Sequence, residues 1–448
     1  MRRFYNLLWL LPLAFIDSAC TDQCTETRVF RQFTPVTLTT TQVRQGVRVD
    51  AARDLEQPGK IYTKDGYLFI NELKRGIHII DNRNPEAPKP LAFLTVPGNG
   101  DIAIRDNFLY ADSYMDLVTF DISNLADIRE VSRSQNVFTN GQFDGGWWSY
   151  SPTTYTSNNT QVPNDLINDQ NVSYVTQTMR TNCEASPTNT GGWWGGAWFA
   201  TANMSADVSR STGSPGGGTN GTGGSMARFT LYDKFLYAVT QSDMKLFNIQ
   251  SPARPAMAKT INLGWGIETI FPYKDKLFIG SNTGMLIYDN ADPADPKRLS
   301  VFQHARVCDP VVVHDNTAYV TLRSGNTCQG FTNQLDVVDI TSLTSPRLLK
   351  SYPMRNPHGL GVDFPNLFVC EGAYGLKSLN VSDPMQVDKG LQQYIEDLKA
   401  YDVIPMGTVS GKKTLLLIGR DGFYQFDYSN PRNLRLLSRI PVKSPVLT

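Results

Sequence analysis

The sequence predicts an all-β protein, and a repeated motif carries this prediction. Seven segments share one pattern, in which an apolar strand ends at an Asp or Asn and a polar turn, usually with proline, follows. The Asp or Asn stands at Asp81, Asp121, Asn248, Asp289, Asp339, Asn380 and Asp427. The successive spacings are 40, 127, 41, 50, 41 and 47 residues, so a period near 40 recurs, with one insert of about 87 residues. Short strands at this period are typical of a β-propeller.

Each repeat is expected to contribute four strands. An opening segment such as KIYTKD comes first, YLFINE follows as the second strand, GIHIID is the motif strand, and PLAFLTVPG supplies the fourth. Four short strands form one propeller blade. The sequence thus predicts a seven-bladed β-propeller over residues 59–448, with a long low-complexity insert at 133–225, after the second blade.

The recurring Asp or Asn has a structural explanation. Its side chain can accept the backbone N–H two residues later, which forms an Asx-turn, and the proline that follows fixes φ and ends the strand ladder. Because the residue recurs in every repeat, a structural role is favoured over that of a catalytic acid.

These repeats resemble the LVIVD-repeat family of bacterial and archaeal surface proteins. The segment LDVVDI at 335–340 is close to the family's name-giving core, and the resemblance covers roughly residues 60–132 and 226–440. It implies a propeller fold and transfers no catalytic residue. The sequence departs from the family pattern at Asn248 and Asn380 and in its long insert.

The N-terminus has the pattern of an export signal. Arg2 and Arg3 precede an apolar run over residues 7–16, which is too short to span a bilayer, and small residues lead to Cys20. We expect residues 1–19 to be a lipoprotein-type signal peptide and Cys20 to carry lipid, with residues 20–58 as a tether and N-terminal strand region. This predicts a protein of the cell envelope, at the outer membrane or cell surface, held by its lipid anchor alone. Simple secretion is the alternative.

The other cysteines include one candidate disulfide. Cys308 opens a repeat and Cys328 lies in an enlarged hairpin of the same repeat, so a Cys308–Cys328 bond is expected in an oxidising compartment. Cys370 falls in an apolar strand and is expected to be a core residue.

One polar residue stands at or near the start of each innermost strand. Because blade symmetry brings equivalent positions into a ring, these side chains are expected to meet at one mouth of the central channel. They are Lys60, Asp101, Arg228, Glu268, Asp309, His358 and Asp402. The group could hold a divalent cation, with Asp309, Glu268 and His358 as metal candidates, although mutual pairing of the charges is favoured. A second tier, at or just past the ends of the second strands, comprises Glu72, Asp112, Arg323, Glu371 and Arg420.

The insert loses the repeat period and is rich in Ser, Thr, Asn and Gly. Two of its segments, GGWWSY and GGWWGGAW, nearly repeat each other. The composition predicts a flexible surface excursion with a few anchoring aromatic residues. Alternatively, the tryptophan pairs stack on a ligand such as a sugar.

Composition and motifs narrow the function. The formal net charge is zero and no basic stripe is present, which argues against a nucleic-acid partner. No known catalytic signature occurs, so the sequence favours a binding or interaction scaffold for a protein or glycan, with no catalysis of its own. One alternative is a channel-mouth enzyme, either a metal-assisted hydrolase or a lactonase-like protein. The other is glycan binding through the Trp-rich insert.

Overall fold

The computed structural model describes residues 23–143, 146–182, 211–212, 222–225, 227–303, 310–323, 333–409 and 411–443. The chain clusters into two compact units. The smaller comprises Met1–Gln32 and Tyr174–Ala202, and its described residues belong to the neighbouring strands β1 (Gln23–Thr39) and β15 (Leu166–Asn182). The larger unit, Phe33–Ser173 and Asn203–Thr448, carries the repeats. The fold is all-β, and α1 (Thr40–Gln45) is the one α-helix in the part of the chain described.

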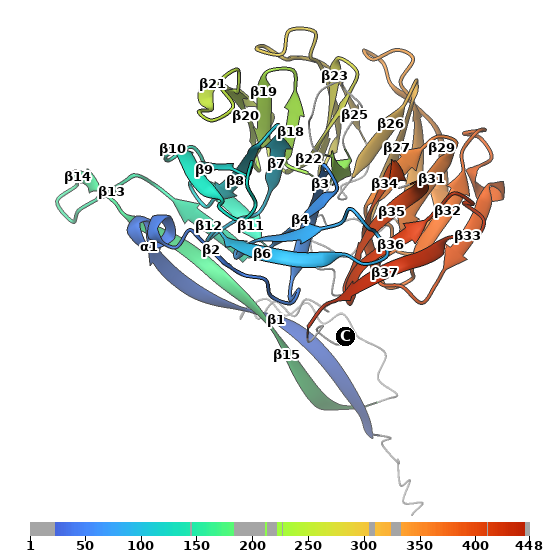
Figure 1. Cartoon of the computed structure of the whole chain (residues 1–448), viewed down its shortest axis with the longest axis horizontal. Coiled ribbons are helices and arrows are strands. Elements are labelled where there is room, and N and C mark those ends of the chain that lie inside the picture. The colour runs from blue at the N-terminus through green and yellow to red at the C-terminus, as the bar shows by residue number, and fades with distance from the viewer. Residues whose placement is uncertain are drawn as a thin grey trace, which may run out of the picture. The chain divides into compact units, whose positions relative to one another are not determined.

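The repeats form seven four-stranded antiparallel units in the described part of the larger unit (Figure 1), called the first to seventh sheet below. The first contains β3 (Pro58–Lys64), β4 (Tyr67–Glu72), β5 (Gly76–Asp81) and β6 (Lys89–Thr95). The second contains β7 (Ile102–Arg105), β8 (Phe108–Ser113), β9 (Asp116–Asp121) and β10 (Arg129–Ser134). The third contains β18 (Phe229–Tyr232), β19 (Phe235–Val239), β20 (Asp243–Asn248) and β21 (Ala256–Asn262).

The remaining sheets repeat this order of strands. The fourth contains β22 (Ile267–Tyr273), β23 (Lys276–Ser281), β24 (Gly284–Asp289) and β25 (Lys297–Gln303). The fifth contains β26 (Val311–His314), β27 (Thr317–Leu322), β28 (Gln334–Asp339) and β29 (Arg347–Pro353). The sixth contains β30 (Leu360–Asp363), β31 (Asn366–Cys370), β32 (Leu376–Asn380) and β33 (Leu391–Ile395), with the 3₁₀ turn η1 (Val387–Lys389) before its last strand. The seventh contains β34 (Ala400–Val409), β35 (Lys412–Gly419), β36 (Gly422–Asp427) and β37 (Arg435–Pro441).

The predicted Asx-turns are confirmed in all seven sheets. At the end of each third strand the Asp or Asn side chain accepts the N–H of the residue two positions later, over 2.8–3.2 Å. The N–H of Thr341, for example, donates to Asp339 Oδ1 at 2.9 Å. The turn leads the chain into a fourth strand, which carries the exposed outer edge of the sheet.

Buried side chains pack the sheets face to face in a propeller-like order. Second and third strands are buried on both faces, because each sheet has a neighbour on either side. First strands contact one another in the order β3, β7, β18, β22, β26, β30, β34, and β35 contacts β3 again. A tyrosine hydroxyl repeatedly donates to a turn carbonyl of the next sheet, as from Tyr110 to Pro252, Tyr237 to Pro293 and Tyr352 to Pro384. The predicted core position of Cys370, in β31, is confirmed.

The first and last sheets, blue and red in Figure 1, are joined directly. Leu55 and Val442 form a parallel bridge, and the N–H of Lys443 donates to the Leu55 carbonyl at 2.6 Å. Asn82 and Gln425 exchange two hydrogen bonds of 2.9 and 2.6 Å, although 343 residues separate them in the sequence. The strand β2 (Arg48–Ala51) pairs with β6 and so extends the outer edge of the first sheet.

Part of the insert is regular β-structure, which corrects the prediction of a flexible excursion. Strands β11 (Asn140–Phe143) and β12 (Gly146–Tyr150) share a sheet with β15 and β1, in the order β1-β15-β12-β11, and β13 (Thr153–Tyr155) pairs with β14 (Gln161–Pro163). Asp169 of β15 accepts from Lys74 Nζ at 2.8 Å and from the Tyr114 hydroxyl at 2.7 Å. The described part of the insert up to Asn182 forms regular structure because residues outside the insert supply both a partner strand and buried polar contacts.

The end of the insert returns among the first strands of the sheets. Strand β17 (Thr222–Ser225) pairs with β16 (Ser211–Thr212) and, on its other side, with the inner edge of β3. It also contacts β30 and β34. The Ser225 hydroxyl donates to Asp402 Oδ1 at 3.1 Å and accepts the N–H of Leu360 at 2.9 Å. A strand of the insert therefore packs against the first strands of the first, sixth and seventh sheets.

Within the described ranges, no helix has the length and apolar character needed to cross a membrane.

Candidate functional site

Three of the predicted channel residues meet between the first, second and third sheets. Lys60 Nζ lies 2.5 Å from Asp101 Oδ2, and both side chains are buried. The same carboxylate oxygen accepts the backbone N–H groups of Arg228 and Phe229. Burial lowers the pKa of Lys60, and the negative charge of Asp101 opposes this shift. The Asp101 carboxylate therefore joins three sheets.

The other predicted channel residues lie in separate contacts. His358 Nε2 is 3.4 Å from Arg323 Nη1, and Asp402 accepts from Ser225. Glu268, on β22, is half-buried. Lys60, Asp101 and Arg228 thus meet at one place, while His358 contacts Arg323 and Asp402 contacts Ser225.

Several predictions fall outside the described residues. These are the metal candidate Asp309, the lipidation site Cys20 and the candidate disulfide Cys308–Cys328. Among the residues that are described, no group of three or more His, Cys, Asp or Glu side chains is placed to hold a metal ion. The predicted divalent cation remains a prediction.

The second-tier carboxylates Glu72 and Glu371 each pair with a side chain of the strand that follows in the sequence. Glu72 Oε2 is 2.6 Å from His78 Nε2, and both side chains are buried. Glu371 pairs with Lys377 at 2.9 Å and accepts from the Tyr394 hydroxyl at 3.1 Å. These contacts stabilise the start of a turn or a neighbouring strand and leave little capacity for a ligand.

Asp112 differs from the other acids because it faces a pocket. Its Oδ1 accepts the N–H groups of Gly100 at 2.7 Å and Asp101 at 2.9 Å, and the Asn99 amide at 2.9 Å. Burial raises the pKa of Asp112 to about 6, although the backbone donors oppose the shift.

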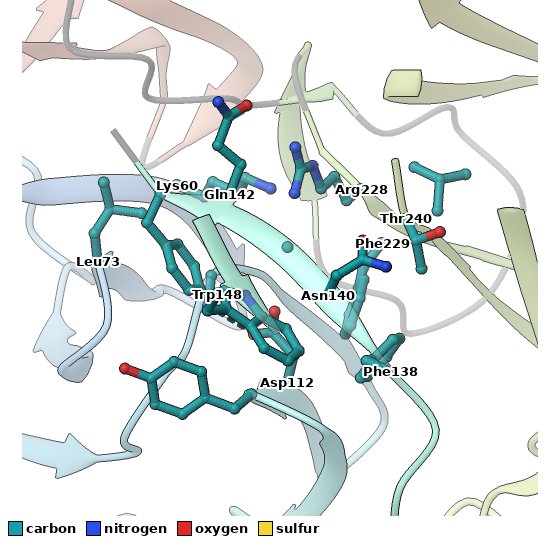
Figure 2. A pocket seen from close by; sticks show the side chains of 15 residues that line it. Lys60, Leu73, Asp112, Phe138, Asn140, Gln142, Trp148, Arg228, Phe229 and Thr240 are labelled. Carbon is teal, nitrogen blue, oxygen red and sulfur yellow. Dashed lines mark hydrogen bonds between the residues drawn. The ribbon is translucent and has the colours of Figure 1, made fainter. Parts of the chain in front are cut away.

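The pocket, of about 50 Å³, lies beside the Lys60–Asp101 pair. In Figure 2, Lys60, Gln142 and Arg228 lie on one side of it, and the rings of Phe138 and Trp148 lie on the other. A space of this size holds a few water molecules or one small charged group. We call it the Arg228 pocket.

The Arg228 side chain brings a hydrogen-bond donor without a described partner to this pocket. Its Nε atom is buried and makes no hydrogen bond to any described residue. The guanidinium also contributes to lowering the pKa of the Lys60 ammonium, because the two charges repel. An anion in the pocket would satisfy the buried donor and relieve this repulsion.

The rim of the pocket continues into an exposed pair of tryptophans. Gln142 of β11 stands opposite Trp147 of β12, so the two side chains share one face of that sheet. Trp147 stacks on Trp265 with ring centroids 5.7 Å apart and an interplanar angle of 17°. The two residues are 38% and 62% exposed, whereas the adjacent Trp148 is buried. The tryptophans of the insert were predicted from the sequence as possible stacking residues, whereas Trp265, the stacking partner of Trp147, was not.

A glycine turn holds Trp265 in place beside the pocket. Gly264 and Gly266 have φ of +92° and +88°, a backbone region that favours glycine. The N–H of Gly266 donates at 2.9 Å to the carbonyl of Gln241, whose neighbour Thr240 lines the pocket. The signal in the sequence was therefore the triplet Gly-Trp-Gly, which places a large aromatic side chain between two turn residues.

Comparison with known proteins supports the repeat assignment. The LVIVD repeat model matches residues 99–135 and 308–353. The chain carries LVIVD repeats. The resemblance predicted from the sequence is thus confirmed at these two regions, which contain the motif residues Asp121 and Asp339. No curated protein matches the chain.

Three solved structures resemble the chain at low sequence identity. The computationally designed Ika8 protein is 8% identical, with a TM-score of 0.48 over 87% of this chain and 89% of its own. A functionally unknown protein from Desulfotomaculum acetoxidans is 10% identical, with a TM-score of 0.44 over 86% and 95%. BamB from Moraxella catarrhalis is 8% identical, with a TM-score of 0.42 over 87% and 95%. At these scores the likenesses carry no argument about function.

Proposed function

We propose that this protein is a binding scaffold of the cell envelope, anchored through lipid on Cys20, with no catalysis of its own. In this proposal the seven sheets are the blades of one closed, seven-bladed β-propeller. The circular order of contacts between first strands supports closure, as do the bonds between the first and last sheets. The export pattern that ends at Cys20 supports the anchor.

One contrast favours binding over catalysis. A general acid or base must reach the proton that it transfers. The carboxylates of Asp101, Glu72 and Glu371 are instead engaged by cations, a histidine or backbone amides. The Arg228 guanidinium, by contrast, keeps a buried donor without a partner beside a pocket. Such a site can hold an anionic group.

The channel-mouth enzyme remains the second candidate, and Asp112 is the observation in its favour. A carboxyl group with a pKa of about 6 that lines a pocket could exchange protons near neutral pH. If hydrolytic turnover is found and Asp112→Asn abolishes it without loss of folding, this candidate replaces the scaffold.

Retention of envelope material tests the proposed function. The full-length protein is immobilised and compared with Arg228→Gln and with Arg432→Gln, a matched change at an exposed arginine. Wild type and Arg432→Gln should retain a polysaccharide or a protein fraction that Arg228→Gln retains at least tenfold less. Equal retention by all three proteins contradicts binding at this pocket.

The anchor is tested separately. Mass spectrometry of the mature N-terminal peptide should detect lipid on Cys20, and Cys20→Ser should release the protein from the membrane fraction. An unmodified cysteine in membrane-associated protein contradicts this part of the proposal.

A further inference from the structure

The Arg228 pocket and the Trp147–Trp265 pair form one continuous surface. Gln142 lines the pocket and stands opposite Trp147, and Trp147 stacks on Trp265. The turn that carries Trp265 is hydrogen-bonded to Gln241, next to Thr240 on the pocket wall. Resting on the binding function proposed above, we infer that this surface recognises an acidic glycan, a chain of sugar rings that bears carboxylates.

The pocket selects the carboxylate. A guanidinium presents donors in a planar fork that matches the two oxygens of a carboxylate. The buried Nε of Arg228 has no partner within the described chain and would gain one from such a ligand. About 50 Å³ accommodates a carboxylate but not a sugar ring, so the ring must lie outside the pocket.

The tryptophan pair provides the place for the rings. Stacked indoles offer a flat, rigid apolar face, and burial of such a face under a ring is favourable. Asn140, Gln142 and Thr240 border the same pocket and carry neutral amide or hydroxyl groups that can bond sugar hydroxyls. The pocket wall also carries Lys60, which is paired with Asp101, and the Asp112 carboxyl. Aromatic rings, neutral polar groups and the Arg228 donor together match a polyhydroxylated ligand with isolated negative charges.

Other polymers match this surface less well. A polyphosphate needs several clustered cations, whereas the chain has equal numbers of basic and acidic residues and Lys60 is already paired with Asp101. A protein partner is usually held by a large side chain inserted into a deep apolar pocket. Here the apolar part is an exposed stack and the enclosed part is small.

Calorimetric titration with defined oligosaccharides tests the inference. The probes are tetramers of galacturonate, glucuronate and mannuronate, with methyl-esterified tetragalacturonate and neutral maltotetraose as ring controls and tetraglutamate as a charge control. Wild type should bind at least one uronate at least tenfold more tightly than the ester, maltotetraose and tetraglutamate.

Two variants separate the roles of the pocket and the stack. Arg228→Gln should remove the preference for the uronate over its methyl ester. Trp265→Ala should weaken the binding of both the uronate and the ester by several-fold. Trp265 is exposed, so its loss should leave the melting temperature unchanged. Tyr155→Ala, a change at an exposed aromatic of β13, is the matched control and should bind like wild type.

The outcomes distinguish this inference from the proposed function. Binding of tetraglutamate as tight as that of every uronate, or no binding of any uronate, overturns the glycan inference. If Arg228-dependent retention of an envelope protein fraction persists in that case, the binding scaffold stands. If Arg228→Gln changes neither retention nor titration, both proposals fail.

Discussion

Gln425→Ala should destabilise the protein by removing buried hydrogen bonds that join its last sheet to its first. Gln425 is fully buried and exchanges two hydrogen bonds with Asn82, which is also buried. It also donates at 3.1 Å to the Pro85 carbonyl and to Ser438 Oγ. Pro85 keeps the Ser438 hydroxyl as a donor at 2.6 Å, so the unmet groups after truncation are the carbonyl and amino ends of Asn82.

The expected loss of unfolding free energy follows from the two Asn82 groups that lose their partner. A buried polar group left without its partner costs about 1–3 kcal/mol, and two such groups plus a small cavity cost about 3–5 kcal/mol of unfolding free energy. Tyr237→Phe is the matched control. It removes one inter-sheet hydroxyl, which donates to Pro293 at 2.8 Å, and should cost about 1 kcal/mol.

Urea denaturation gives the cost, and hydrogen exchange gives its location. Because the bonds join β5–β6 to β36–β37, amide protection should fall in both the first and the seventh sheet of Gln425→Ala. A cost no larger than that of Tyr237→Phe would refute the argument, as would a loss of protection confined to the seventh sheet.

Three further predictions concern single side chains. Asp339→Ala removes an Asx-turn bond and a surface pair with Arg347, so it should lower the unfolding free energy by about 0.5–1.5 kcal/mol in denaturant titrations. Asp169→Ala removes the buried carboxylate that pairs with Lys74 and accepts from the Tyr114 hydroxyl, and leaves Lys74 with the Gln170 carbonyl, so it should cost about 3 kcal/mol and speed protease cleavage within residues 140–173. The pKa of Asp112 is raised from 3.8 to about 6, so the folded state holds a proton that the unfolded chain has released, and this carboxyl reduces stability as pH rises from about 4 to 6. Asp112→Asn removes that dependence, and unfolding curves between pH 4 and 7 should diverge from wild type by at most about 3 kcal/mol.

Each of these three predictions can be checked by a control variant or contradicted by a stated result. Asp339→Asn should keep the turn, so a cost equal to that of the alanine variant contradicts the Asx-turn argument. Asp165→Ala, at an exposed neighbour of Asp169, should leave cleavage unchanged. Parallel pH profiles for wild type and Asp112→Asn contradict the raised pKa.

The repeats were predictable because their causes are local. An apolar strand, an acceptor side chain and a turn lie within a few residues, and all seven turns form the expected bond. Alignment of the repeats also placed Lys60, Asp101 and Arg228 at equivalent positions, and consecutive sheets bring the Lys60 ammonium and the Arg228 backbone N–H to the same Asp101 oxygen.

The structure of the insert and the tryptophan stack depend on partners far away in the sequence. The polar strand β15 is ordered beside β1, more than a hundred residues earlier, and the composition of the insert contains no trace of that partner. The pairing of the insert strand β17 with β3, and the hydrogen bond from Ser225 to Asp402, could not be anticipated from an alignment of the repeats, because β17 lies outside them. Trp265 was missed because its stacking partner belongs to the insert.

The position of β17 constrains the order in which the molecule is assembled. This strand precedes five of the seven sheets in the chain, so during synthesis it is available while β3 is already made and β30 and β34 are not. In the closed propeller proposed above, the later sheets can add to a strand that is already paired with β3, and neither terminus has to be threaded through a finished ring. Gln425 belongs to the seventh sheet, so its contact with Asn82 can form only after the earlier sheets have been synthesised. A nascent chain that lacks the seventh sheet could therefore pair β17 with β3 but would miss the Ser225–Asp402 bond and the joint between the first and last sheets.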